Sequence, residues 1–401
     1  MGAASDVRDD VAAGGDDDPL RQAEATAWGR GRRRHARRSR AVTGVFAVAA
    51  ALLGARIASA LDTPGPLVLD GAVYAWAAIA GLWIVGLPLE IMAWRASLRA
   101  GLSRQQFPSW IADQLKGLAI GAVVAPFAMV GLVAALREWP HGWWLPVAGG
   151  SLALELLFSV VAPVLIVPLF TPSLALPEGP LADDLNALAE RGGVRVRAVR
   201  VLETSAKSSV SNAYVAGYGP TRRIMLFDTL LGDQPEADEQ LAETRAVLAH
   251  ELGHHANRDL WRMTAVSALS TAVSLAVVAF ALLHLPGVLT HRSAGAFAMI
   301  PALFVCTAVT QMVAGVAAGA YSRRRERAAD AYGIDLIGDG EPFARALEHL
   351  CAVNLAELRP PRHVQWLGAS HPPPFERIAR ARSRSLAPWK ENPTNGANGA
   401  V

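Results

Sequence analysis

Six long apolar stretches divide an otherwise polar chain. A transmembrane helix needs about 20 apolar residues to cross a hydrocarbon core of roughly 30 Å, and each of these stretches is long enough. The fourth carries one acid, Glu155, which we expect to face the protein interior because a carboxylate is costly in lipid. We therefore predict membrane spans at residues 41–61, 71–94, 118–136, 143–170, 263–285 and 294–321.

Lysine and arginine are unevenly divided between the two ends of these spans. One side carries four basic clusters, whereas the other side has only Arg137 and Arg292. By the positive-inside rule the basic side is cytoplasmic. We therefore predict a multi-pass protein of the cell membrane whose two termini and long insertion, residues 171–262, all lie in the cytoplasm. The clusters lie within residues 30–40, 95–116, 191–262 and 323–327.

The long insertion has the pattern of a small folded domain. Three leucines from Leu181 to Leu188 repeat at helical spacing, and residues 194–202 alternate valine with arginine as a strand does. A short apolar run at 224–227 predicts a second strand. A further helix is expected from about Pro235, because proline and acidic residues favour a helix N-terminus. The insertion is therefore predicted to be α+β.

Composition supports a membrane protein and excludes other classes. Of the 401 residues, 52% are hydrophobic, and the mean hydropathy of +0.26 is high for a soluble protein. The basic cluster at 30–40 directly precedes an apolar run and no recognition motif accompanies it, so no nucleic-acid partner is expected. Cys306 and Cys351 lie in different surroundings and imply no disulfide framework.

The segment His250-Glu251-Leu252-Gly253-His254 carries recognisable chemistry. Two imidazoles four residues apart lie one turn apart on one face of a helix and can bind one ion. Glu251, on the neighbouring face, can reach a water bound to that ion. Zinc acidifies such a water and polarises a substrate carbonyl, while the carboxylate takes the proton and passes it to the leaving amine. The motif predicts a zinc endopeptidase with one Zn²⁺ per chain.

A catalytic zinc needs a third protein ligand and an open position. A third histidine six residues beyond the second is ruled out by Leu260, and no acid occurs between Asp259 and Glu326. Glu326 is therefore the first downstream acid available, although it could equally pair with the arginines beside it. Asp330, four residues later on the same helical face, could accept the second ring N–H of a ligand histidine.

The last two spans place these residues at one height. They should form an antiparallel hairpin that turns near Thr290, and His254 and Glu326 each lie 36 residues from that turn. At 1.5 Å per residue each arm extends at most about 54 Å, against a hydrocarbon core of roughly 30 Å. The metal site is therefore expected at the cytoplasmic interface.

Four separated blocks of sequence carry a family resemblance. In order they are SNAY at 211–214, the HELGH motif, SRRRERAADA at 322–331, and SHPP at 370–373 followed by Arg377. Together they resemble the type I CAAX prenyl endopeptidase family and its bacterial relatives, including the HtpX-like quality-control proteases. The resemblance implies a membrane zinc metallopeptidase. It departs in one respect, because the eukaryotic prenyl proteases have seven spans where six are predicted here.

The resemblance also implies roles for individual residues. Glu326 would be the third zinc ligand, and Asp330 would orient a ligand histidine. Asn212 would lie on a strand beside the cleft and hydrogen-bond the substrate backbone by strand addition. His371 would face the zinc and stabilise the oxyanion, and Arg377 would be a substrate-orienting or structural partner of the site.

These observations predict a mainly α fold, in which a polytopic helical bundle carries a cytoplasmic α+β, zincin-like metalloprotease domain. We expect a disordered segment at 1–40, a membrane domain of four spans at 41–170, a protease domain at 171–385 that includes the last two spans, and a disordered tail at 386–401.

The leading interpretation is hydrolysis of peptide bonds in membrane-associated or misfolded polypeptides at the cytoplasmic interface, with polypeptides and the lipid bilayer as partners. An intramembrane-cleaving protease is a rival, disfavoured because charged residues at 236–245 and 258–262 bracket the motif. A non-catalytic membrane scaffold with a structural zinc is another, although structural sites usually have four protein ligands, often cysteines.

Overall fold

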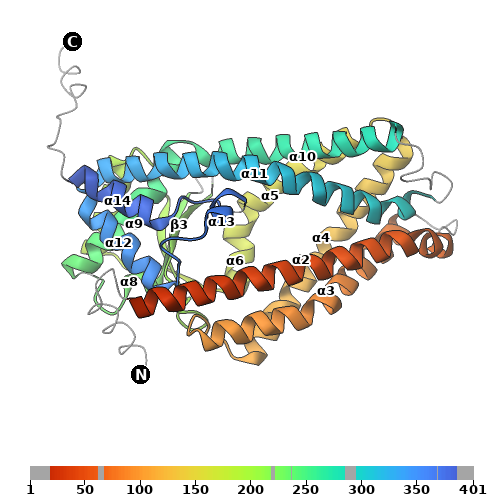
Figure 1. Ribbon diagram of the computed structural model, residues 1–401. Coiled ribbons are helices and arrows are strands. Elements are labelled where there is room, and N and C mark those ends of the chain that lie inside the picture. Colours follow the sequence, from red (N-terminus) through yellow and green to blue (C-terminus); the bar gives the residue numbers. More distant parts are fainter. Residues whose placement is uncertain are drawn as a thin grey trace, which may run out of the picture.

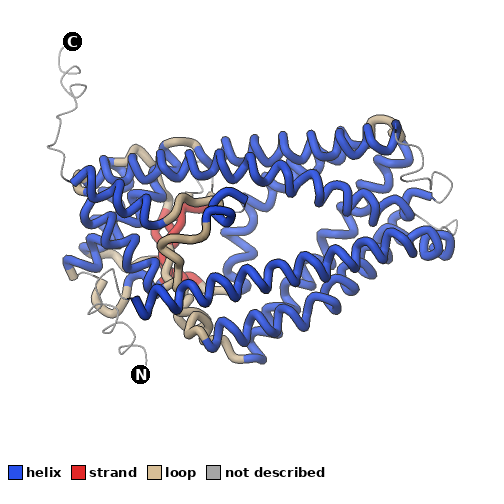
Figure 2. Tube along the Cα trace, viewed as in Figure 1, coloured by secondary structure: helices blue, strands red, loops and turns tan. Residues whose placement is uncertain are grey.

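The computed structural model describes residues 19–61, 67–217, 222–235, 237–284, 295–367 and 369–385. Figure 1 shows long helices running together along the length of the molecule, with the shorter helices gathered at one end. Figure 2 shows the strands at that same end, beside loops. The long helices are α2 (Pro19–Leu61), α3 (Leu67–Arg99), α4 (Phe107–Glu138), α5 (Trp144–Val161), α10 (Asp259–His284) and α11 (Gly295–Ile337).

Five of the described helical segments are long and apolar enough to cross a membrane. Their outer surfaces expose large apolar side chains, among them Phe127, Leu269 and Met312, as expected of helices that contact lipid. Six spans were predicted, and five are found among the described residues. The first predicted span, residues 41–61, is the second half of α2 and is not one of the five. The five are Leu67–Arg99, Phe107–Glu138, Trp144–Phe170, Asp259–Leu282 and Ala302–Ile337.

The fourth predicted span is a helix with a π-helical turn inside it. After α5 the chain forms the π-turn Ala162–Ile166 and then the short helix α6 (Val167–Phe170). Pro163 lies in this turn and has no N–H to donate to the preceding turn of helix, so the local widening is explained by the missing hydrogen bond.

The prediction that residues 1–40 are disordered is wrong from Pro19 onward, because residues 19–40 are the first half of α2. Arg33 forms a two-pronged ion pair with Glu357, at 2.7 and 2.9 Å, and Arg21 donates to the carbonyl of Ala352. These partners lie more than 300 residues away along the chain. The contacts stabilise the first half of α2, which its polar composition alone would not stabilise as a helix. Residues 1–18 and the predicted tail at 386–401 lie outside the described residues.

The insertion contains a four-stranded sheet in the order β1-β2-β4-β3. The two central strands are parallel, and each edge strand is antiparallel to its neighbour, so β3 is an edge strand. Leu185, Ile224 and Leu252 belong to the hydrophobic core that joins the sheet to α7 (Pro180–Arg191) and α9 (Asp238–Ala256). The strands are β1 (Ser173–Ala175), β2 (Ala198–Leu202), β3 (Ala213–Ala216) and β4 (Arg223–Phe227).

Four short helices complete this end of the molecule. They are α8 (Asp228–Leu231), α12 (Gly340–Val353), α13 (Arg362–Leu367) and α14 (Pro374–Ser385). Buried apolar residues of α12, including Phe343, form a second core with α14 and with the end of α11. The polytopic helical bundle and the α+β domain at one end of it together confirm the predicted fold class.

Helices α9 and α11 pack with their backbones nearly in contact. A Cβ atom built on Gly253 would lie 2.8 Å from the carbonyl oxygen of Ala329, and one on Gly333 would lie 3.0 Å from the backbone nitrogen of His250. Real Cβ atoms essentially never come within 3.0 Å of another heavy atom, so glycine at 253 is required by this packing. The close approach brings side chains of α11 within reach of the histidines on α9.

Gly253→Ala should therefore force α9 and α11 apart. We expect a loss of about 1–3 kcal/mol of stability, the usual cost of overpacking, together with reduced metal retention. Thermal unfolding in detergent and metal analysis would measure both. Gly315→Ala is the matched control, because nothing lies within 4 Å of a Cβ built there. Equal unfolding temperatures for the two variants would contradict the packing argument.

Candidate metal centre

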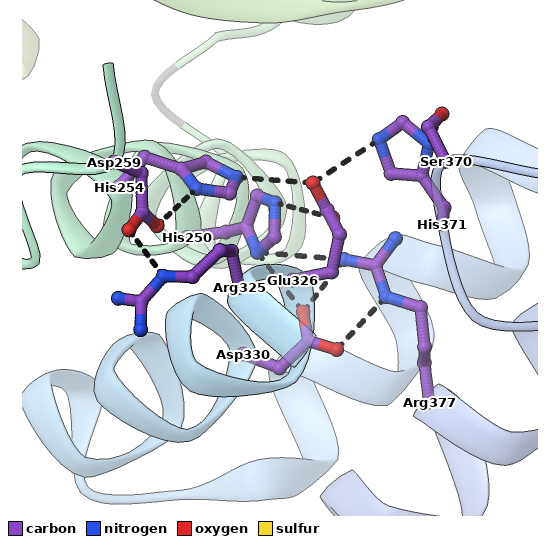
Figure 3. Close-up of polar contacts among 9 residues, drawn as sticks. All are labelled: His250, His254, Asp259, Arg325, Glu326, Asp330, Ser370, His371 and Arg377. Atoms are coloured by element: carbon purple, nitrogen blue, oxygen red, sulfur yellow. Dashed lines mark hydrogen bonds and ion pairs between the residues drawn. The ribbon is translucent and has the colours of Figure 1, made fainter. Parts of the chain in front are cut away.

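Helix α9 presents His250 and His254 on one face, and α11 brings Glu326 against them (Figure 3). Nε2 of His250 lies 3.5 Å from Oε2 of Glu326, and Nε2 of His254 lies 3.4 Å from Oε1. One ligand atom can be chosen from each of the three residues so that all three atoms lie within 4.8 Å of one another. The structure thus brings the three predicted metal ligands together.

The spacing of these atoms fits a metal ion. Ligands that surround zinc tetrahedrally at about 2.1 Å lie about 3.4 Å from one another, which is the separation found between the imidazole nitrogens and the carboxylate. Oε2 of Glu326 is buried and has no hydrogen bond within the described residues. A buried carboxylate oxygen without a hydrogen bond is costly unless a cation satisfies it. Two imidazoles and one carboxylate form a common donor set for catalytic zinc.

The first ligand is oriented by the predicted Asp330. This carboxylate is buried and accepts the Nδ1–H of His250 at 2.9 Å, which turns Nε2 toward Glu326. Arg377 in turn donates to both Asp330 oxygens, at 2.9 and 2.6 Å. Burial lowers the pKa of Arg377, but the carboxylates of Asp330 and Glu326 raise it and the net shift is upward. The guanidinium therefore remains charged and holds Asp330 in place.

The second ligand has a partner that sequence reasoning missed. Asp259, the first residue of α10, is buried and accepts the Nδ1–H of His254 at 2.9 Å. Arg325 on α11 donates its Nε–H to the other Asp259 oxygen. Burial tends to lower the pKa of His254, but the bonds to Asp259 and Glu326 raise it to about 10. The one signal in the sequence is an acid five residues beyond the second histidine.

The turn between α9 and α10 explains how Asp259 reaches back. Helix α9 ends at Ala256, and Arg258 adopts a left-handed conformation with φ of 55° before α10 begins at Asp259. This tight reversal returns the first carboxylate of α10 to the end of α9. A left-handed conformation is uncommon for arginine, so this turn could not be predicted from the residue types.

Glu251 lies between the two ligand histidines in sequence. Burial raises the pKa of its carboxyl, Glu326 acts in the same direction, and the imidazoles and Arg377 act in the opposite one. A general base works best when its pKa lies near the working pH, so a raised carboxyl pKa suits proton transfer.

His371 and Asn212 are placed differently. Nε2 of His371 lies 3.4 Å from Oε1 of Glu326, and its Nδ1 lies 2.8 Å from the Ser370 hydroxyl, so the ring faces the ligand cluster from an exposed loop (Figure 3). Asn212 is exposed immediately before β3, and its carbonyl accepts from the backbone of Phe227. No contact between Asn212 and the ligand cluster occurs in the described residues.

Two side chains outside the predicted set fasten β3 beside the cluster. Asn354 at the end of α12 donates to the carbonyl of Ser211 and accepts from its N–H, at 2.9 and 3.0 Å. At the other end of the strand, Nε2–H of His255 donates to the carbonyl of Val215 at 3.2 Å. His255 directly follows a ligand histidine, so this bond ties the edge strand to the ligand helix.

Two family models match the chain. Residues 175–385 match peptidase family M48, and residues 41–172 match the CAAX prenyl protease N-terminal model, described as five membrane helices. In this chain that second region holds the latter half of α2, then α3, α4 and the segment from α5 to α6. The first match alone covers just over half of the chain.

Relatives and one solved structure are consistent with these matches. The uncharacterized metalloprotease YhfN of Bacillus subtilis is 26% identical over 315 residues, which cover 76% of this chain and 71% of the relative. The CAAX prenyl protease 1 homolog of Arabidopsis thaliana is 28% identical over 292 residues, which cover 70% of this chain and 65% of the relative. The crystal structure of Ste24p from S. mikatae superposes with a TM-score of 0.79 at 21% identity. The superposition covers 92% of this chain and 90% of the Ste24p chain. That likeness shows a shared fold.

Asp259→Asn should weaken metal binding by roughly 10- to 100-fold, the usual effect of losing a carboxylate that orients a ligand imidazole. The measurement is metal retention in competition with a chelator. Asp335→Asn is the control, because its carboxylate is 73% exposed and pairs with the exposed Arg384. Unchanged metal retention in the Asp259 variant would show that His254 is oriented without it.

Proposed function

Because this chain belongs to peptidase family M48 and is a membrane metalloprotease, we propose that His250, His254 and Glu326 bind its metal ion as a single zinc. The convergence of the two imidazole nitrogens on the Glu326 carboxylate, at 3.5 and 3.4 Å, carries this proposal, since zinc commonly binds two imidazoles and one carboxylate at such close quarters. The described residues supply three ligands, as a catalytic zinc with an open position requires, whereas structural sites usually have four.

Zinc, when bound, acidifies water and polarises the carbonyl of the scissile peptide bond. In the proposed mechanism Glu251 accepts a proton from the attacking water while the water oxygen bonds to the carbonyl carbon. The carboxyl group then delivers this proton to the leaving nitrogen as the C–N bond breaks. His371 lies on the exposed side of Glu326 and donates a hydrogen bond to the oxyanion that forms.

Asp330 and Asp259 accept the Nδ1–H of the two imidazoles, which directs each Nε2 toward the position of the metal. Arg377 is then a structural partner of the site, since its guanidinium is directed at Asp330. Asn212 is assigned to the substrate backbone, because it precedes an edge strand fastened to α9 and an extended peptide can add to such an edge.

The proposed substrates are membrane-associated or misfolded polypeptides that reach the site at the cytoplasmic interface. The start of α2 supports this topology, because Arg33 pairs with Glu357 and so places the beginning of α2 at the protease end of the molecule (Figure 1). The basic clusters lie at the same end. We further propose domains at 41–170 and 171–385, a division supported by family models that meet between residues 172 and 175.

Glu251→Gln should retain zinc and lose at least 100-fold of the rate of casein cleavage, because the amide cannot accept the proton. Zinc content and casein hydrolysis are the two measurements. Glu239→Gln is the matched control, since Glu239 is exposed in the first turn of the same helix. Proteolysis that persists in the Glu251 variant would refute the mechanism.

Cysteine labelling should test the orientation. In a background lacking Cys306 and Cys351, Glu239→Cys should react with an impermeant thiol reagent only when the cytoplasmic face is accessible. His141→Cys, exposed in the connection between α4 and α5, should react only from the opposite face. The reverse pattern would overturn the proposed topology and leave the chemistry intact.

A further inference from the structure

Four arginines form a continuous basic face on the first half of α2. Arg30, Arg34, Arg37 and Arg38 are exposed and follow the i, i+4, i+7, i+8 spacing that places residues on one side of a helix. Within the described residues none of the four has an acidic or carbonyl partner. The mechanism uses none of them, so this basic face is a surface whose charge is unpaired.

Contacts elsewhere on the same helix hold the basic face in a fixed orientation. Ala25 is buried in a small apolar cluster with Leu102 and Leu355. Arg33 pairs with Glu357, and Gln22 accepts from the backbone N–H of Leu358. Helix α2 also packs along α11. The four arginines are therefore presented on a helix that is held at several points.

The basic face directly precedes the apolar half of α2, which begins at residue 41, where the match to the membrane-helix family model also begins. At 1.5 Å per residue, Arg38 lies about 5 Å and Arg30 about 16 Å before that point. The polar headgroup layer of a bilayer is about 5–8 Å thick. Arg37 and Arg38 then lie at headgroup depth, and Arg34 lies within about one Debye length of it.

We propose that this basic face binds the phosphate groups of anionic phospholipids in the bilayer that holds the protein. Guanidinium groups donate in pairs to phosphate oxygens, which suits arginine better than lysine for this contact. The inference rests on the match of residues 41–172 to the membrane-helix family model and is independent of the peptidase mechanism. Since α2 is fastened to the segment after α12, a lipid bound here also anchors the protease end to the membrane surface.

The experiment uses the full-length protein in detergent and fluorescent phosphatidylglycerol as probe. Each arginine near an anionic surface contributes about fivefold to binding. The triple variant Arg34→Gln, Arg37→Gln, Arg38→Gln should therefore bind phosphatidylglycerol on the order of 100-fold more weakly. Phosphatidylcholine binding should be weak in both proteins, and raising the salt concentration should weaken phosphatidylglycerol binding to the unaltered protein.

Two controls separate this contact from general loss of charge or fold. The variant Arg191→Gln, Arg195→Gln, Arg197→Gln removes the same charge from exposed positions at the end of α7 and beyond it, and should retain lipid binding. Unchanged zinc content and casein cleavage would show that the α2 variant is folded and active.

Three results would overturn the proposal. The α2 variant could retain its preference for phosphatidylglycerol, or the control variant could lose it equally. Alternatively, free phosphate or an acidic peptide could displace the lipid at equal concentration, which would assign the basic face to a soluble anion. If the unaltered protein does not cleave casein, the peptidase proposal is refuted and the lipid result still stands.

Discussion

The close contact between α9 and α11 is the constraint on which the proposed metal centre depends. Two imidazoles on one helix supply only part of a catalytic zinc site, and the third ligand must come from another element at a fixed distance. Gly253 and Gly333 allow the two backbones to approach until Glu326 reaches both histidines. A wider separation would leave the carboxylate on α11 and the imidazoles on α9 unable to share one ion.

Each ligand histidine is then supported in the same way by a buried carboxylate and an arginine. His250 contacts Asp330, which pairs with Arg377. His254 contacts Asp259, which pairs with Arg325. A buried carboxylate is costly unless it is paired, so each arginine stabilises the aspartate that accepts the imidazole N–H. The two supports fix both rings before metal arrives, which reduces the reorganisation that binding requires.

The sequence allowed the ligands to be predicted because their chemistry is local or follows from elimination. The HELGH motif needs only helical spacing, and Glu326 was the first available acid. Asp259 was missed as a partner of His254, since its role depends on the left-handed turn at Arg258. The predicted disorder before residue 41 failed for a similar reason, because Arg33 is stabilised by Glu357, which is remote in sequence. Contacts of this kind are decided by tertiary structure rather than by propensity.

The same helices that contact lipid also carry the site. Helix α11 runs without a break from exposed apolar residues such as Met312 to Glu326 and Asp330, and α10 begins at Asp259 and continues into its own apolar segment. Within α11 no break in the helix separates its apolar segment from Glu326, the proposed third ligand. A displacement of α11 against α10 or α9 would therefore move the third ligand and the Arg325–Asp259 contact together. The apolar segment of α11 and the residues proposed to bind and orient the metal are thus parts of one continuous helix, unlike those of a protease domain joined to its membrane anchor by a flexible linker.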